Sequence, residues 1–184
     1  MIGNDLIYLP HWPQRSGHRL QRFREKIYLE SERKVIENSP QPFFTEALLW
    51  SAKEAAYKIW VRQTVLKLFN PKNFEVLLVG ELTRNFSSQN LQVNTSLKKG
   101  ETTYKLHSCL RNKYLFTSAY SNSVYPSANQ IESRVFNKKQ SELRHQNQLW
   151  KLCKTPLNVP NLKLGNKELP VSLSHDNEGF WYTW

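Results

Sequence analysis

The chain of 184 residues is poor in cysteine, with only Cys109 and Cys153. Two cysteines cannot build the multi-disulfide framework of a small secreted domain, so we expect a reducing, cytoplasmic compartment. Long hydrophobic runs are missing too: no stretch approaches the roughly 20 apolar residues that a membrane span requires, and the mean hydropathy is −0.63. Near the N-terminus, Asp5 stands where a signal peptide would carry basic and apolar residues. These shortages predict an intracellular protein without a membrane partner.

Acidic residues are also scarce, since 15 Asp and Glu face 26 Lys and Arg and the formal net charge is +11. Such an excess indicates a polyanionic partner: nucleic acid, a membrane, a phosphorylated ligand or an acidic protein. The charge is spread along the chain, with no purely basic run longer than a pair such as Lys98-Lys99. No zinc spacing or aromatic RNA-binding motif is visible. The charge therefore predicts a class of partner, or simply a solvated surface, but no mechanism.

Hydrophobic periodicity predicts an α+β fold in which two long helices lie over an antiparallel, meandering sheet. The clearest helix covers residues 43–69, which lack Gly and Pro, with Thr45 as its N-cap. A second amphipathic helix is predicted over 131–152, and a shorter one after Leu29. The predicted strands cover residues 2–9, 74–79, 91–97, 102–109, 114–120, 170–174 and 180–184. We expect one domain over 1–184, with halves 1–122 and 123–184 left open.

The sharpest chemical signal lies in the first long helix. Trp50, Glu54 and Lys58 are four residues apart and form one row, while Lys53 lies on the flank. A carboxylate between lysines suits a metal-bound phosphate, because carboxylates bind hard cations and lysines neutralise phosphate oxygens. The alternative is an ordinary surface pair between Glu54 and Lys58, worth a few tenths of a kcal/mol.

Two further features add polar groups at other points of the chain. Asp5 interrupts an apolar strand, where a charge is costly unless it is paired or binds a metal, or else faces water at an edge. Ser174 and His175 end a short strand at a turn, where side chains and amides can meet a phosphate. A direct Ser174–His175 dyad is disfavoured because neighbouring strand residues point to opposite faces. A plain turn histidine remains the alternative.

Taken together and in this order, these features resemble the 4′-phosphopantetheinyl transferase superfamily. The matching stretches are residues 2–7, the run Trp-Ser-Ala-Lys-Glu-Ala-Ala-Tyr-Lys at 50–58, and residues 170–176. Residues 22–33 resemble the basic stretch that follows the first motif. The order, with the aspartate first and the Ser-His motif last, resembles the holo-acyl-carrier-protein synthase branch. The resemblance implies the phosphopantetheinyl transferase fold, with two pseudo-symmetric halves as one form of it.

The resemblance implies an enzyme that moves the 4′-phosphopantetheine arm of coenzyme A onto a carrier-protein serine and releases 3′,5′-ADP. It implies that Asp5 and Glu54 hold Mg²⁺, and that Lys58 stabilises the transferring phosphoryl group or assists proton removal. Lys53, Lys58, Ser174 and His175 would contact coenzyme A. Ile7 and Tyr8 stand where family members often carry a second acid, which leaves a third metal ligand open.

The implied partner is an acidic acyl- or peptidyl-carrier protein of fatty acid or polyketide biosynthesis. The docking patch predicted for it is a basic stretch near the N-terminus, formed by Arg15, Arg19, Arg22, Arg24 and Lys26. We expect neither nucleic acid nor membrane as a partner. Two alternatives stay open: a catalytically weak family member that binds carrier proteins, and a basic nucleic-acid-binding domain, whose affinity would fall steeply with salt.

Overall fold

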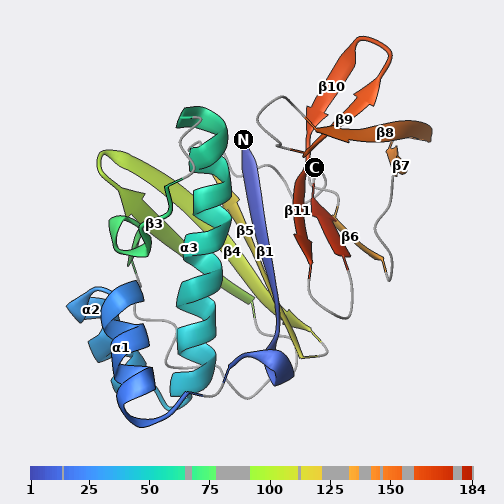
Figure 1. The fold of residues 1–184 in the computed structure, drawn as a ribbon. Helices are drawn as coiled ribbons and strands as arrows, with labels where there is room; N and C mark the ends of the chain where they lie inside the picture. Colours follow the sequence, from blue (N-terminus) through green and yellow to red (C-terminus); the bar gives the residue numbers. More distant parts are fainter. Residues whose placement is uncertain are drawn as a thin grey trace.

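A computed structural model places most of the chain in helices and antiparallel strands (Figure 1). The structure describes residues 1–13, 15–64, 68–77, 92–111, 113–121, 133–136, 142–145, 147–154, 160–175 and 180–183. The predicted α+β class, with helices on antiparallel sheets, is confirmed.

The larger sheet has the strand order β1-β5-β4-β3-β2, and each neighbouring pair is antiparallel. Its strands are β1 (Ile2–Tyr8), β2 (Glu75–Leu77), β3 (Gln92–Lys99), β4 (Thr102–Arg111) and β5 (Tyr114–Tyr120). The predicted hairpin around Gly100 is therefore present as β3 and β4. Short 3₁₀ turns, η1 (Leu9–His11) and η2 (Pro71–Asn73), follow β1 and precede β2.

Helix α3 (Pro42–Thr64) crosses one face of this sheet, and α1 (Gly17–Ile27) and α2 (Glu30–Glu37) lie beside its N-terminal part (Figure 1). The helix was predicted over 43–69 with Thr45 as N-cap, and this detail is wrong. The helix begins at Pro42, whose fixed φ and missing N–H suit a first turn. Thr45 lies inside the helix, where its amide donates to Gln41 O.

Small residues on α3 let it approach the sheet closely. Ala52, Ala55 and Ala56 are buried, and Ile59 packs with them in the main core. On β1, Gly3 faces this stripe, and a Cβ at Gly3 would lie 2.1 Å from the Ala55 carbonyl oxygen. The glycine is therefore required by the contact between β1 and α3.

The C-terminal part is built from strands, which corrects the prediction of a helix over 131–152. The structure has β6 (Ser133–Phe136), β7 (Glu142–His145) and β8 (Gln148–Lys154) there. Leu143 and Trp150 are directly paired across β7 and β8 and are both buried, whereas Leu149 is 53% exposed. Asn147 adopts φ 60° between the two strands, where a left-handed residue reverses the chain. The apolar residues thus follow a cross-strand pairing that can be mistaken for a loose helical spacing.

Two small sheets complete the fold. One has the order β10-β9-β8-β7 and the other β11-β12-β6. The added strands are β9 (Pro160–Leu164), β10 (Lys167–Pro170), β11 (Ser172–His175) and β12 (Phe180–Thr183). A small core of Leu143, Trp150, Leu162 and Val171 supports the first sheet, while β11 lies beside β1 (Figure 1).

Candidate functional site

The site begins where β1 passes under α3. Gly3, Asp5 and Ile7 share the α3-facing side of β1 because strand side chains alternate. Asp5 is paired with Thr117 of β5 in the middle of the ladder, and its side chain is 13% exposed. The close approach at Gly3 thus carries the Asp5 carboxylate against α3.

Asp5, Glu54 and Lys58 lie together at this contact. The Lys58 Nζ is 3.7 Å from Asp5 Oδ1 and donates a hydrogen bond of 2.6 Å to the carbonyl oxygen of Asn4. The charges of Asp5 and Lys58 both act on the Glu54 carboxyl group. Two of the predicted carboxylates and the predicted lysine therefore share one site, although the two acids lie far apart in the sequence.

The electrostatics of the site favour a bound cation. Burial raises the pKa of Asp5 above its usual range, against the opposing effect of Lys58. Burial, and then the Asp5 charge, raise the pKa of Glu54 to about 7. Desolvation lowers the pKa of Lys58, while Asp5 and Glu54 act in the opposite direction. Burial disfavours the charged form of both carboxyl groups, and the Asp5 charge adds to this at Glu54, so a divalent cation between them would favour the charged forms.

Unused hydrogen-bonding capacity points the same way. Asp5 Oδ2 and the Ser51 hydroxyl, one turn before Ala55 on α3, are buried and form no hydrogen bond of ordinary geometry among the described residues, although Ser51 lies near enough to Asp5 to lower its pKa. A buried polar atom without a partner is costly and calls for a ligand, ion or water. Asp5 and Glu54 therefore fit a hard cation such as Mg²⁺. Within the described residues no group of three His, Cys, Asp or Glu side chains is present, so water or phosphate oxygens would complete its coordination.

Lys53 does not share this site, which argues against the predicted contact with a coenzyme A phosphate. Its side chain is completely buried, and Nζ donates to Glu32 Oε1 at 2.8 Å, Pro71 O at 3.0 Å and Phe74 O at 2.6 Å. These three bonds use all three protons of the ammonium group. Glu32 also accepts from the amides of Leu29 and Val76. Lys53 therefore ties α2, η2 and β2 to α3.

Ser174 and His175 lie on β11, the strand beside β1. Their backbone pairs with Trp181 and Phe180 of β12. Their side chains are outside what the structure describes, so their contact with a phosphate stays a prediction.

The predicted docking patch divides into two groups. Arg19, Arg22 and Lys26 are exposed, and their spacing along α1 puts them on one face. Arg15 and Arg24 instead make internal contacts. The Arg15 guanidinium lies 3.8 Å from the centre of the Phe23 ring, and Arg24 Nε forms a 2.6 Å salt bridge with the buried Glu46.

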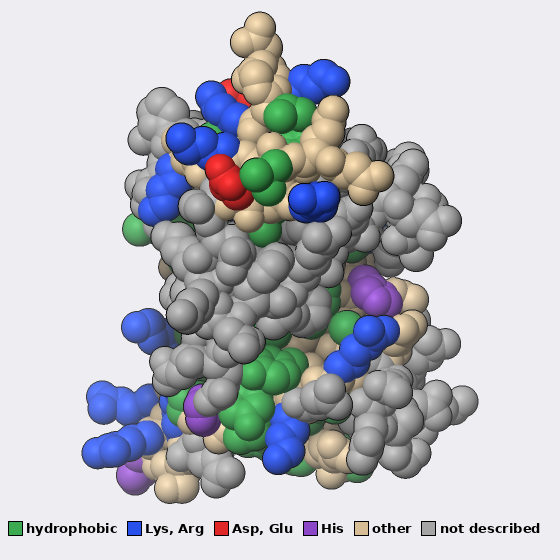
Figure 2. Space-filling view, turned by 90° about the vertical axis from the view of Figure 1, so that its right-hand side faces the viewer, with side chains coloured by type: hydrophobic (Ala, Val, Ile, Leu, Met, Phe, Trp, Pro, Cys, Tyr) green, Lys and Arg blue, Asp and Glu red, His purple; other side chains and the backbone are tan. Residues whose placement is uncertain are grey.

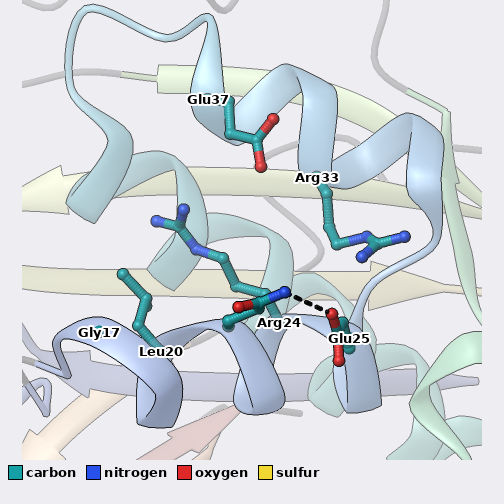
Figure 3. A pocket seen from close by; sticks show the side chains of 7 residues that line it. Gly17, Leu20, Arg24, Glu25, Arg33 and Glu37 are labelled. Atoms are coloured by element: carbon teal, nitrogen blue, oxygen red, sulfur yellow. Dashed lines mark hydrogen bonds between the residues drawn. The ribbon is translucent and has the colours of Figure 1, made fainter.

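A cavity of about 390 Å³ lies between α1 and α2. Arg24, Glu25, Arg33 and Glu37 line it together with Gly17, Leu20 and Gln21 (Figure 3). Its charges are of both signs, and Gln21 donates a hydrogen bond to Glu25 across one turn (Figure 3). None of its lining residues belongs to the Asp5–Glu54–Lys58 site. On the face that Figure 2 presents, Lys and Arg side chains lie at both ends.

Sequence reasoning missed three residues of the site region. Gly3 and Ser51 carry no signal of their own, because their roles depend on the packing of β1 against α3. Arg62 could have been found, since it continues the row of Glu54 and Lys58 by one more turn.

Two partly buried carboxylates beside a lysine form a site that can hold a cation and a phosphate group at one place. A comparison with known families identifies the family to which this site belongs. A family model described as the 4′-phosphopantetheinyl transferase superfamily matches residues 1–116, well over half of the chain. The chain belongs to the 4′-phosphopantetheinyl transferase superfamily, whose members are transferases that use coenzyme A and act on carrier proteins.

A search of curated proteins found no match to this chain. Within the described residues, no helix has the length and apolar character that crossing a membrane requires.

Proposed function

We propose that this protein transfers the 4′-phosphopantetheine moiety of coenzyme A to a serine of an acyl- or peptidyl-carrier protein, in a Mg²⁺-dependent reaction that releases 3′,5′-ADP. The observation that carries the proposal is the convergence of Asp5, Glu54 and Lys58 between β1 and α3. Phosphoryl transfer needs positioning and charge neutralisation more than covalent help from the protein, and these three residues supply both.

Asp5 and Glu54 would hold Mg²⁺, which supplies charge neutralisation at the pyrophosphate of coenzyme A. Asp5 Oδ2 can act as a ligand because it forms no hydrogen bond of ordinary geometry among the described residues. Lys58 keeps one bond to the main chain at Asn4, which fixes its ammonium group close to Asp5. We assign Lys58 the stabilisation of charge on the transferring phosphoryl group, because its Nζ lies 3.7 Å from Asp5 Oδ1 and an ammonium group placed there can neutralise a phosphate oxygen.

Ser174 and His175 would contact the phosphates of coenzyme A, with His175 at the 3′-phosphate. Their strand, β11, lies beside the strand that carries Asp5. For this reason we propose that residues 1–184 act as one unit, with the C-terminal strands completing a site whose metal ligands lie in the first part. Lys53 is left out of substrate binding because its three protons are already donated inside the protein.

The carrier would dock on the exposed face of α1, where Arg19, Arg22 and Lys26 can meet acidic side chains. Replacing all three by Glu should raise the KM for the carrier and leave the KM for coenzyme A unchanged. The exposed lysines Lys151, Lys154 and Lys167 on the small sheet, changed to Glu, provide the control for net charge. An unchanged KM for the carrier in the triple variant would refute docking on α1. We place the reaction in the cytoplasm, in keeping with the two free cysteines.

The experiment that tests the function incubates the protein with coenzyme A, Mg²⁺ and an apo-carrier protein and measures the mass of the carrier. We expect a gain of one phosphopantetheine group, which Glu54→Gln should abolish. Glu101→Gln, at an exposed turn between β3 and β4, is the matched control and should retain full transfer. Carrier binding without any mass gain would instead favour the catalytically weak binding module, and neither binding nor transfer with any carrier would refute the proposal.

A further inference from the structure

Arg62 joins three segments that are far apart in the sequence. Its Nη1 donates to Ile2 O of β1 at 3.2 Å, and its Nη2 donates to the carbonyl oxygen of Val171, the residue before β11. Arg62 itself lies on α3, one turn after Lys58. The guanidinium group is mostly buried, which lowers its pKa to about 10 but leaves it charged at neutral pH.

The strands β1 and β11 and the helix α3 all extend from the Arg62 contacts toward the candidate site, the helix in the reverse chain direction. The two chain termini lie at the same end of the molecule, and α3 ends there too (Figure 1). Since β12 leads to the C-terminus and is antiparallel to β11, β11 runs in the same direction as β1.

The distances along the three segments agree. At about 3.3 Å per strand residue, Asp5 lies roughly 10 Å beyond Ile2, and His175 roughly 13 Å beyond Val171. At about 1.5 Å per helix residue, Glu54 lies roughly 12 Å before Arg62. The backbones of Asp5, Glu54 and His175 therefore lie at similar distances, roughly 10–13 Å, from the end of the segments that Arg62 holds together.

Backbone pairing does not fix β11 against β1 in the described residues. The strand β1 is an edge of the five-stranded sheet, and β11 is an edge of the three-stranded sheet. The two strands are in contact but belong to different ladders. A side chain that bonds to the start of both strands can set their relative height, and a rigid, planar guanidinium with several donors suits this role.

We infer that Arg62 is a positioning residue that fixes β11, and with it Ser174 and His175, relative to Asp5, Glu54 and Lys58. What the positioned residues bind rests on the proposed function, whereas the positioning itself does not.

The test compares Arg62→Met with the control Arg111→Met, which removes an exposed arginine at the end of β4. Hydrogen exchange measured by mass spectrometry should show the amides of residues 172–175 exchanging about 10-fold faster in Arg62→Met, with β4 and β5 unchanged. The control should match the parent protein throughout. If Arg62→Met loosens the whole chain, Arg62→Gln, whose amide can still donate to a carbonyl, takes its place under the same criteria. An unchanged exchange rate at 172–175 in a folded variant would overturn the inference.

A second readout links the position of β11 to coenzyme A. In the parent protein, calorimetry should give a lower Kd for coenzyme A than for dephospho-coenzyme A, which lacks the 3′-phosphate. Arg62→Met should raise the Kd for coenzyme A about 10-fold and bring the two values together, and Arg62→Lys should restore part of the difference. A general loss of stability would weaken both ligands alike, and that result would count against a positioning role. If the parent protein binds neither ligand, the proposed function fails, while the exchange measurement still decides the role of Arg62.

Discussion

Lys53 and Lys58 lie little more than one turn apart on α3, yet their surroundings differ. The buried charges on the Lys53 side are fully hydrogen-bonded, whereas those on the Lys58 side are not. On the side of α2, Lys53 and Glu32 form a fully buried ion pair, and both groups also bond to the main chain. On the side of β1, burial and then the Asp5 charge raise the pKa of Glu54, and Asp5 Oδ2 forms no hydrogen bond of ordinary geometry among the described residues. A satisfied network of buried charges holds the fold together, whereas an unsatisfied one is suited to a ligand.

The largest effect on stability is expected on the satisfied side. Lys53→Met leaves Glu32 as a buried, uncompensated charge, so the free energy of unfolding should fall by about 3–5 kcal/mol. Urea unfolding followed by circular dichroism measures this loss. If Lys58→Met lowers stability just as much, the proposed contrast between the two sides is wrong.

The largest effect on activity is expected on the unsatisfied side. Lys58→Met should reduce the transfer rate by about 10²–10³-fold, because one charged donor to the reacting phosphoryl group is lost. Its unfolding free energy should change much less than that of Lys53→Met. A single-turnover assay with coenzyme A and an apo-carrier measures the rate, and a variant of normal rate would remove Lys58 from the site.

A smaller loss of stability and activity should follow from a change at Gly3, where β1 contacts α3. Gly3→Ala puts a Cβ against the Ala55 carbonyl, which cannot move without shifting α3. Overpacking of this kind costs about 1–3 kcal/mol. Thermal unfolding should show the loss, and transfer should fall because β1 and Asp5 move away from Glu54.

The smallest expected effect is a change of stability with pH that depends on Glu54. Glu54 has a pKa of about 7 in the folded chain and an ordinary value of 4.5. Between these values the folded state holds a proton that the unfolded chain has released, so the free energy of unfolding should fall as pH rises through this window. Thermal unfolding in EDTA should show this fall, and Glu54→Gln should flatten it. An equally steep fall in Glu54→Gln would assign the effect to another group.

Spacing in the sequence predicted part of how the candidate site is arranged. The row of Trp50, Glu54 and Lys58 is set by helix geometry alone, and Asp5 stands out as a charge in an apolar strand. Spacing could not tell the two lysines apart, since the difference depends on Glu32, which reaches α3 only through the packing of α2.

The fold was predictable where the period was long and regular, as in α3, and where short strands flank a clear turn, as in β3 and β4. It was not predictable over 131–152, because Leu143 and Trp150 are partners across a hairpin and their separation in the sequence matches a helical spacing. The contacts of Arg62 could not be predicted from the sequence for a different reason. Its acceptors are main-chain carbonyls of Ile2 and Val171, which no side-chain pattern reveals.

Binding of a divalent cation shows most directly whether Asp5 and Glu54 beside β1 form a site for a cation and a phosphate group. Electron paramagnetic resonance can count bound Mn²⁺ as a substitute for Mg²⁺, with and without coenzyme A. We predict one Mn²⁺ bound per chain in the presence of coenzyme A, and none with Glu54→Gln or Asp5→Asn. Equal Mn²⁺ binding by the parent chain and both variants would contradict the account.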